Sequence, residues 1–281
     1  MRKKMSQKTE IYVCFHNVNH IDEIKKNIKE NNIYKPLFLG ANKHDSEINA
    51  YKDNTGDNIS NVNNNFSELT GLYWMWKNSK ADIIGLVHYR RYFVTRKYFG
   101  KILSETDIKK DLENNDIILV KGTKLLEGNN YVSFRGWKKH LDMIWDSIKE
   151  VCPEYEDSFK KVMFSEQPIS FFNMFIAPKD IIDGYCEWLF PLLFYTYEKH
   201  EKCKESRLMG CLSEFLINIY AYHHNLRIKE EEIKFTDKKI KRRMFILRLG
   251  INRFLYEKWF KFKNRNNEEY QNLVKKYKTI K

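Results

Sequence analysis

The 281-residue sequence predicts an α/β fold with a mainly parallel central sheet. Short runs of apolar, β-branched residues alternate with longer stretches that carry apolar residues at helical spacing. The clearest strand, residues 82–87, is apolar on both faces, as a strand covered by helices on either side would be. Aromatic residues make up 15% of the chain, which argues against disorder and supplies a sizeable core.

The first third of the chain contains two predicted strands and the loop that follows them. Residues 11–15 form the first strand, and a short helix follows over residues 21–30. Residues 34–39 form the second strand, where Pro36 indicates an edge or a strand start because proline cannot donate to a sheet. Residues 53–60 are a polar loop rich in turn-forming residues.

Residues 65–78 are predicted to form a helix that packs on this sheet. Asn65 precedes Glu68 by three residues, which has the form of a capping box with Asn65 as the N-cap. Gly71 lies in the middle, where glycine costs about 1 kcal/mol relative to alanine, so we expect a close approach of backbone or ligand there. One apolar face of this helix is formed by Leu69, Leu72, Tyr73 and Trp76.

The second half of the chain continues the alternation. Strands are predicted over residues 116–120 and 171–177. Helices are predicted over residues 137–148, 179–197 and 208–219. This order of elements favours one α/β domain.

The net charge of +13 is concentrated near the C-terminus. Residues 237–265 contain eleven Lys and Arg against two acidic residues, which is about +9. We therefore predict a domain over residues 1–235 and a basic, aromatic-rich helical tail over residues 236–281. Basic residues beside aromatic residues and leucines are typical of an interfacial membrane helix, so an anionic membrane surface is the expected partner of residues 238–263. The alternative is a helix docked on the domain, because residues 244–263 give no clean apolar face.

Cysteine usage and hydropathy indicate the compartment. The five cysteines show no CxxC pair and no zinc spacing, which suits reduced thiols in the cytoplasm. No apolar run has the length of a signal segment or a membrane span. We expect a cytoplasmic protein, with peripheral attachment to the inner face of the membrane if the tail binds lipid.

The most informative segment joins the strand over residues 82–87 to a cluster of cations. Residues 88–91 read His-Tyr-Arg-Arg. Ligands of open α/β sheets bind at the carboxyl ends of the strands, and guanidinium groups suit phosphate and diphosphate. His16 and His20 follow the first strand, where a nucleotide base could dock. Solvated loop charges are the competing interpretation of both groups.

Five segments of the sequence form a set of motifs in a fixed order. They are residues 53–60, 67–78, 85–93, 173–176 and 207–216. Together they resemble an uncharacterised-domain family encoded in bacterial capsule and exopolysaccharide clusters, whose members are regarded as glycosyltransferases, some similar to galactofuranosyltransferases. The resemblance covers about residues 10–232.

The resemblance implies the GT-A fold, which binds nucleotide-diphosphate sugars. Most such proteins hold a divalent metal with Asp-x-Asp at the end of a central strand, where this sequence has His88, Tyr89, Arg90 and Arg91 instead. We therefore predict no cofactor: the two arginines clamp the diphosphate, and His88 or Tyr89 lies close to the donor. Asp57 could supply a metal ligand, which leaves a divalent cation as the alternative.

Three more residues complete the predicted site. Asn173 lies in a segment that resembles the strand carrying an asparagine near the sugar hydroxyls in several sugar transferases. Glu214 is predicted close to the buried side of its helix, where a carboxylate is costly unless it is paired or used, so it is the predicted general base, with Asp57 as runner-up. Arg207 could instead pair with Glu214 from two turns away. Glu68, in the second motif, is counted with the substrate-binding residues.

These observations lead to a predicted glycosyltransferase. It would move a hexose, with galactofuranose or galactose as first candidates, from a UDP-sugar to a lipid-linked or other glycan acceptor in capsule, exopolysaccharide or O-antigen synthesis. A sugar-phosphate transferase is the alternative enzyme. A nucleic-acid-binding protein is the non-enzymatic alternative, but no nucleic acid is expected as a partner because the basic residues lie outside the motif-rich domain and no nucleic-acid motif occurs. No P-loop, GxGxxG or HExxH motif is present either.

Overall fold

The structure is a computed structural model in which most of the first 236 residues are described. None of its described helices is long and apolar enough to cross a membrane. The predicted tail lies outside the described residues except for Thr236, so the boundary at residue 235 and the tail's helix stay predictions. The described residues are 7–28, 31–43, 47–96, 100–124, 130, 138–200 and 205–236.

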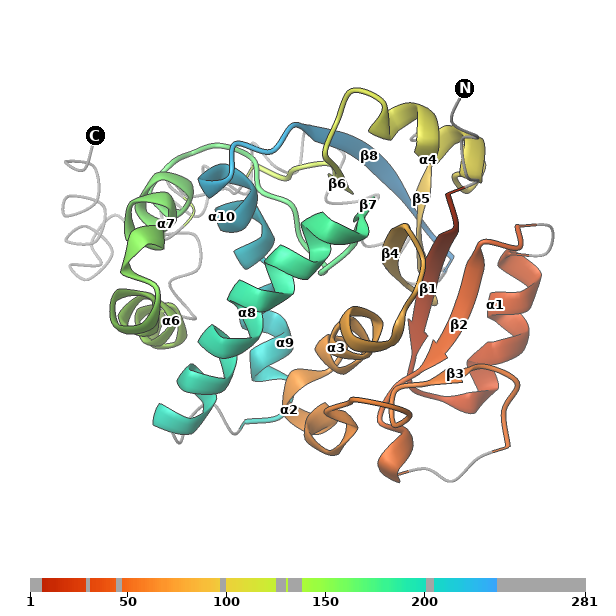
Figure 1. The fold of residues 1–281 in the computed structure, drawn as a ribbon, viewed down its shortest axis with the longest axis horizontal. Coiled ribbons are helices and arrows are strands. Elements are labelled where there is room, and N and C mark those ends of the chain that lie inside the picture. Colours follow the sequence, from red (N-terminus) through yellow and green to blue (C-terminus); the bar gives the residue numbers. More distant parts are fainter. Residues whose placement is uncertain are drawn as a thin grey trace, which may run out of the picture.

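A mixed sheet forms the centre of the molecule (Figure 1). In the described residues its strands follow the order β3-β2-β1-β4-β5-β8-β6-β7, and β4 also pairs with β7. The last five of these strands therefore close on one another. The strands are β1 (Thr9–Phe15), β2 (Tyr34–Phe38), β3 (Tyr51–Lys52), β4 (Ile83–His88), β5 (Arg91–Val94), β6 (Ile117–Val120), β7 (Phe175–Pro178) and β8 (Ile228–Phe235).

The prediction of a mainly parallel sheet is correct for only part of it. β1, β2, β3 and β4 are mutually parallel, and β6 is parallel to β8. β7 runs antiparallel to β4 and β6, and β5 runs antiparallel to β4 and β8. The cause at β5 is local: His88 pairs with Arg91 across a two-residue turn, and such a hairpin can only join antiparallel strands.

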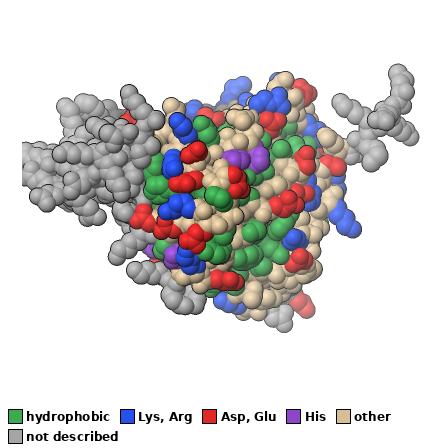
Figure 2. Space-filling model, turned by 60° about the vertical axis from the view of Figure 1, so that its left-hand side comes forward, with side chains coloured by type: hydrophobic (Ala, Val, Ile, Leu, Met, Phe, Trp, Pro, Cys, Tyr) green, Lys and Arg blue, Asp and Glu red, His purple; other side chains and the backbone are tan. Residues whose placement is uncertain are grey.

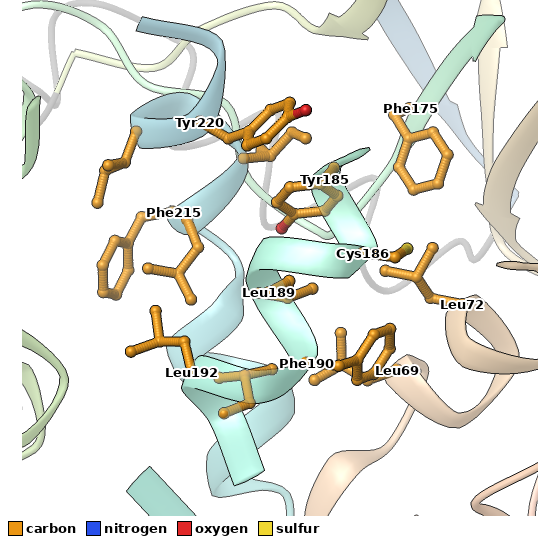
Figure 3. Close-up of a cluster of buried hydrophobic side chains, with 14 of the residues drawn as sticks. Leu69, Leu72, Phe175, Tyr185, Cys186, Leu189, Phe190, Leu192, Phe215 and Tyr220 are labelled. Atoms are coloured by element: carbon orange, nitrogen blue, oxygen red, sulfur yellow. The ribbon is translucent and has the colours of Figure 1, made fainter. Parts of the chain in front are cut away.

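Helices cover both faces of the sheet. Along β1, Tyr12 and Cys14 face one hydrophobic core, while Ile11, Val13 and Phe15 face the other, as side-chain alternation requires. Helix α8 lies across the larger core beside α3 and α10 (Figure 3). The helices are α1 (Ile21–Asn27), α2 (Asn63–Phe66), α3 (Leu69–Asn78), α4 (Glu105–Leu112), α6 (Lys138–Val151), α7 (Glu156–Met163), α8 (Lys179–Lys199), α9 (Leu208–Ser213) and α10 (Leu216–His223).

Gly71 allows α3 to approach the sheet closely. A Cβ at this position would lie 2.8 Å from Leu39 Cδ2 and 3.0 Å from Cys14 Sγ. Real Cβ contacts are rarely this short, so any other residue would push the helix away from β1. The expected close approach is therefore made by apolar side chains of the sheet.

Asp53, the first residue of the predicted polar loop, has a structural role. Its fully buried carboxylate accepts hydrogen bonds from the backbone N–H groups of Gly40 (2.8 Å) and Ala41 (3.0 Å) and from the hydroxyls of Ser60 (2.7 Å) and Thr70 (2.6 Å). Four charge-assisted bonds offset the cost of burying this group. They tie the loop and α3 to the end of β2.

The predicted capping box is wrong. Asn65 lies inside α2, and its side-chain amide donates to the Glu205 carbonyl at 3.2 Å. Ser67, with φ of 48°, separates the two helices, so α3 begins only at Leu69. Glu68 is thereby free to turn its carboxylate toward Asn173.

Two other predicted elements are interrupted at candidate site residues. The strand predicted over residues 171–177 begins only at Phe175, because Phe172 and Asn173 adopt left-handed conformations. The helix predicted over residues 208–219 is two helices, α9 and α10, which are separated at Glu214. Both departures place polar side chains of the candidate site.

Candidate functional site

The candidate site lies at the carboxyl ends of β1 and β4. The chain leaves β1 toward β2 on one side and later returns as β4 on the other, which is the topological switch where ligands bind in open α/β sheets. His16 follows β1 directly, and the Tyr89 N–H donates to the Cys14 carbonyl at 3.1 Å. The structure therefore places the histidine and cationic segments side by side.

The hairpin between β4 and β5 divides the predicted cationic cluster. Tyr89 stacks on His20, with ring centroids 4.1 Å apart and an interplanar angle of 19°. The Arg90 guanidinium carbon lies 4.7 Å from the Tyr89 ring centroid. Tyr89 thus stacks with His20 and Arg90, and this combination of aromatic rings and a guanidinium suits a nucleobase and the phosphate beside it.

Arg91 is turned to the other side of the hairpin. Its guanidinium carbon lies 4.4 Å from the centroid of the Phe172 ring, and burial lowers its pKa. The charges of Glu214 and Glu68 act in the opposite direction on this pKa. Both arginines are half-buried, but Arg91 lies against Phe172 and Arg90 against Tyr89.

A strained turn at Phe172 and Asn173 connects the cationic hairpin to the acidic residues. Their φ angles are 79° and 50°, a region that non-glycine residues adopt at a cost of about 1–3 kcal/mol each. His88 Nε2 donates to the Phe172 carbonyl at 2.6 Å, and the Phe172 N–H donates to the Glu214 carboxylate at 3.4 Å. Because a carbonyl can only accept, His88 carries its proton on Nε2, and burial lowers its pKa, which favours the neutral ring.

Asn173 is buried and fully engaged with the protein. Its amide nitrogen carries two N–H groups and has three acceptors within hydrogen-bond distance: Glu68 Oε1 at 2.6 Å, the Gly210 carbonyl at 3.0 Å and Ser213 Oγ at 3.0 Å. The Ser213 hydroxyl also donates to Asn173 Oδ1 at 3.2 Å. With both ends of its amide occupied, Asn173 joins α9 to Glu68, which is a positioning role.

Glu214 has the most unusual electrostatic environment in this cluster. Burial is the main cause that raises its pKa from 4.5 to about 7, and the negative charge of Glu68 raises it further. The Phe172 N–H and the charges of Arg91 and Arg207 lower it in part. A carboxyl group with a pKa near neutrality suits general base catalysis at neutral pH.

Asp57 is not brought to this cluster. Its carboxylate accepts from the Tyr73 hydroxyl at 3.3 Å, and its backbone bonds the side chain of Asn78, which ends α3. Glu68 lies at the other end of this ten-residue helix, a separation of about 15 Å along the axis. The described residues also contain no group of three His, Cys, Asp or Glu suited to hold a metal ion.

Removing the charge of Glu68 is expected to move the acidic limb of the kcat/KM pH profile to lower pH. Without that negative charge the pKa of Glu214 falls, so the base is ionised at lower pH. Glutamine keeps an oxygen that can accept from Asn173, so Glu68→Gln preserves the positioning bond. The pH profile of this variant, compared with that of the exposed control Glu154→Gln, is the measurement. An unchanged limb would contradict the electrostatic link.

The fold is that of a mixed α/β protein, and a known glycosyltransferase has a similar structure. The structure is similar to the apo structure of WbbM, a bifunctional glycosyltransferase, with a TM-score of 0.71 and 28% sequence identity. The match covers 82% of this chain and 46% of that chain, so the matched part spans less than half of the WbbM chain.

The family is shown by sequence. Residues 10–225 match the family described as Domain of unknown function (DUF4422), and the chain belongs to this family. No curated protein matches the sequence.

Proposed function

We propose that this chain is a glycosyltransferase that moves a sugar from a nucleoside-diphosphate donor to a glycan acceptor in the synthesis of a cell-surface polysaccharide. The observation that carries the proposal is a carboxyl group with a pKa of about 7, Glu214, beside a cationic hairpin at the switch point of the sheet. The likeness to the glycosyltransferase WbbM supports the same chemistry.

On the donor side, His20 and Tyr89 are proposed to hold the nucleobase, and Arg90 and Arg91 the diphosphate. Charge develops on the leaving diphosphate as the bond to the sugar breaks, and guanidinium groups stabilise that charge without a metal ion. The donor is proposed to be UDP-linked, with galactofuranose or galactose as the first candidates. Activity that vanishes with EDTA and returns with manganese would contradict the proposal that the leaving diphosphate is stabilised without a metal ion.

On the acceptor side, Glu214 is proposed to accept the proton of the attacking hydroxyl. The acceptor oxygen forms a new bond to the anomeric carbon, the bond from that carbon to the diphosphate oxygen breaks, and the nucleoside diphosphate leaves. Asn173 and Glu68 are proposed to hold the turn at Phe172 in place for this step. The strain of that turn is consistent with a preorganised site.

The proposed cellular setting follows from the basic tail. Residues 238–263 are proposed to bind an anionic membrane surface on the cytoplasmic side, where a lipid-linked acceptor would be reached. Nucleic acid is not proposed as a partner, because the basic residues of the sequence are concentrated outside the motif-rich domain. On the face shown in Figure 2, basic and acidic side chains are intermixed.

A thermal-shift screen against nucleotide sugars, with and without manganese, tests the proposal. A ligand at 100 times its Kd stabilises a protein by about 2.7 kcal/mol, so the correct donor should raise the melting temperature clearly. Product analysis should then find UDP. Release of UMP would instead indicate a sugar-phosphate transferase, and a protein that no nucleotide sugar stabilises would count against both enzymes.

A further inference from the structure

Arg207 is an exposed arginine held in an unfavourable backbone conformation at the start of α9. Its φ and ψ angles are 63° and 3°, in the left-handed region that favours glycine. The Arg207 N–H donates to the Asn64 carbonyl at 2.7 Å, and its carbonyl accepts from the Cys211 N–H at 3.1 Å. The surrounding chain therefore fixes where this side chain begins.

The guanidinium of Arg207 makes no hydrogen bond or ion pair with another described residue. The pairing with Glu214, which was the alternative considered from the sequence, is thus not formed as a direct contact. The first turn of α9 nevertheless lies against the candidate site, because the Gly210 carbonyl accepts from Asn173 at 3.0 Å. Burial raises the pKa of Glu214, and the positive charge of Arg207 is among the lesser causes that oppose this rise. The same charge acts in the same direction on the pKa of His16, His88, Arg91 and Cys211.

The other two arginines of the candidate site have contacts with described residues. Arg91 stacks on Phe172, and Arg90 lies against Tyr89. The Arg207 guanidinium, by contrast, is exposed and has no ion-pair partner among the described residues. An arriving dianion would therefore gain most from Arg207, because that charge has no protein partner to give up.

We propose that Arg207 is a third diphosphate-binding residue, which binds the donor's phosphates from the start of α9, the helix whose Gly210 carbonyl accepts from Asn173 in the candidate site. The inference rests on the proposed function, since it presumes a nucleoside-diphosphate donor. The inference adds a residue from a distant part of the chain to Arg90 and Arg91, the two residues already proposed to bind the diphosphate. It also accounts for the backbone strain, which fixes a side chain that has no structural bond of its own.

The test is calorimetric titration of the full chain with UDP, GDP, ADP, CDP and inorganic pyrophosphate. Arg207→Gly removes the side chain and leaves the left-handed backbone unstrained, which alanine would not. Arg227→Ala is the matched control, because it removes one exposed arginine that pairs with Asp116 away from the site. Arg207→Gly is expected to lower the affinity for pyrophosphate, and for the nucleoside diphosphate that the wild-type chain binds, by about 10- to 100-fold, the range for a hydrogen bond to a charged group. The affinity for the nucleoside with the same base, titrated in the same way, should not change.

The outcomes separate this inference from the proposed function. If the wild-type chain binds a nucleoside diphosphate and Arg207→Gly binds it as tightly as Arg227→Ala does, only the role of Arg207 is overturned. Equal losses for nucleoside and nucleoside diphosphate would also overturn it, since they would indicate a general disturbance. If the wild-type chain binds none of these anions, the proposed function falls and this inference falls with it. Arg207→Lys should recover little, because an ammonium cannot form the bidentate contact.

Discussion

Replacing Glu214 with glutamine is expected to lower turnover by about 10²- to 10⁴-fold, the usual contribution of a general base. The amide has the same shape, and its oxygen can still accept from the Phe172 N–H, so donor binding should persist. Steady-state kinetics with donor titration measure the effect, which should appear in kcat. A variant that keeps wild-type turnover would exclude Glu214 as the base.

The same substitution should stabilise the protein at alkaline pH. The pKa of Glu214 is about 7 in the folded protein against 4.5 ordinarily, so the unfolded chain loses this proton first as the pH rises. The free energy of unfolding therefore falls between about pH 4.5 and pH 7, by about 3 kcal/mol in total, and Glu214→Gln abolishes this loss. Denaturant unfolding should show little gain at pH 5 and a gain approaching that value at pH 8, whereas Glu154→Gln should show neither.

Replacing Arg91 with alanine is expected to cut turnover by about 10²-fold or more, the scale of removing one preorganised charge-stabilising donor. Arg91→Lys should recover little, because lysine reproduces neither the bidentate fork nor the flat contact with Phe172. The loss should appear in kcat as well as KM if the contact strengthens as the nucleotide departs.

Arg91 also has a second, measurable effect. Its charge lowers the pKa of Glu214, so Arg91→Ala should move the acidic limb of the pH profile to higher pH, opposite to Glu68→Gln. Circular dichroism checks that the variant is folded. A folded Arg90→Ala, Arg91→Ala double variant with wild-type turnover would end the proposal of a diphosphate clamp.

The strands and long helices could be predicted because their signals are local. Apolar, β-branched runs gave β1, β2, β4 and β6, and helical periodicity gave α6 and α8 close to their observed bounds. β3, β5 and β8 were missed. β3 has only two residues. In β5 the apolar run after Arg91 is only three residues long, and β8 is rich in Lys and Glu. Each of these last two strands depends on pairing with the other, which lies far away in sequence.

The site residues show the same division. The cationic segment after β4 could be recognised because strand ends in α/β sheets bind ligands. The arrangement of Glu68 could not be predicted. The local pattern indicated a capping box with Asn65, whereas in the structure Glu68 accepts a tertiary hydrogen bond from Asn173. From the sequence, Arg207 was considered only as a partner of Glu214. The direction in which its side chain leaves the start of α9 depends on a left-handed backbone conformation that the sequence does not reveal.

The closed set of strands β4, β5, β8, β6 and β7 affects how the protein is made. β5 joins β4 through a single residue pair, His88 with Arg91, but joins β8 through four pairs from Arg91 to Val94. On a ribosome, the chain that carries Arg91 is made long before Ile228–Phe235, so β5 waits without its main partner while most of the domain is synthesised. The cationic hairpin therefore takes its final place late, and a nascent chain cannot complete its proposed active site until nearly the whole domain has emerged.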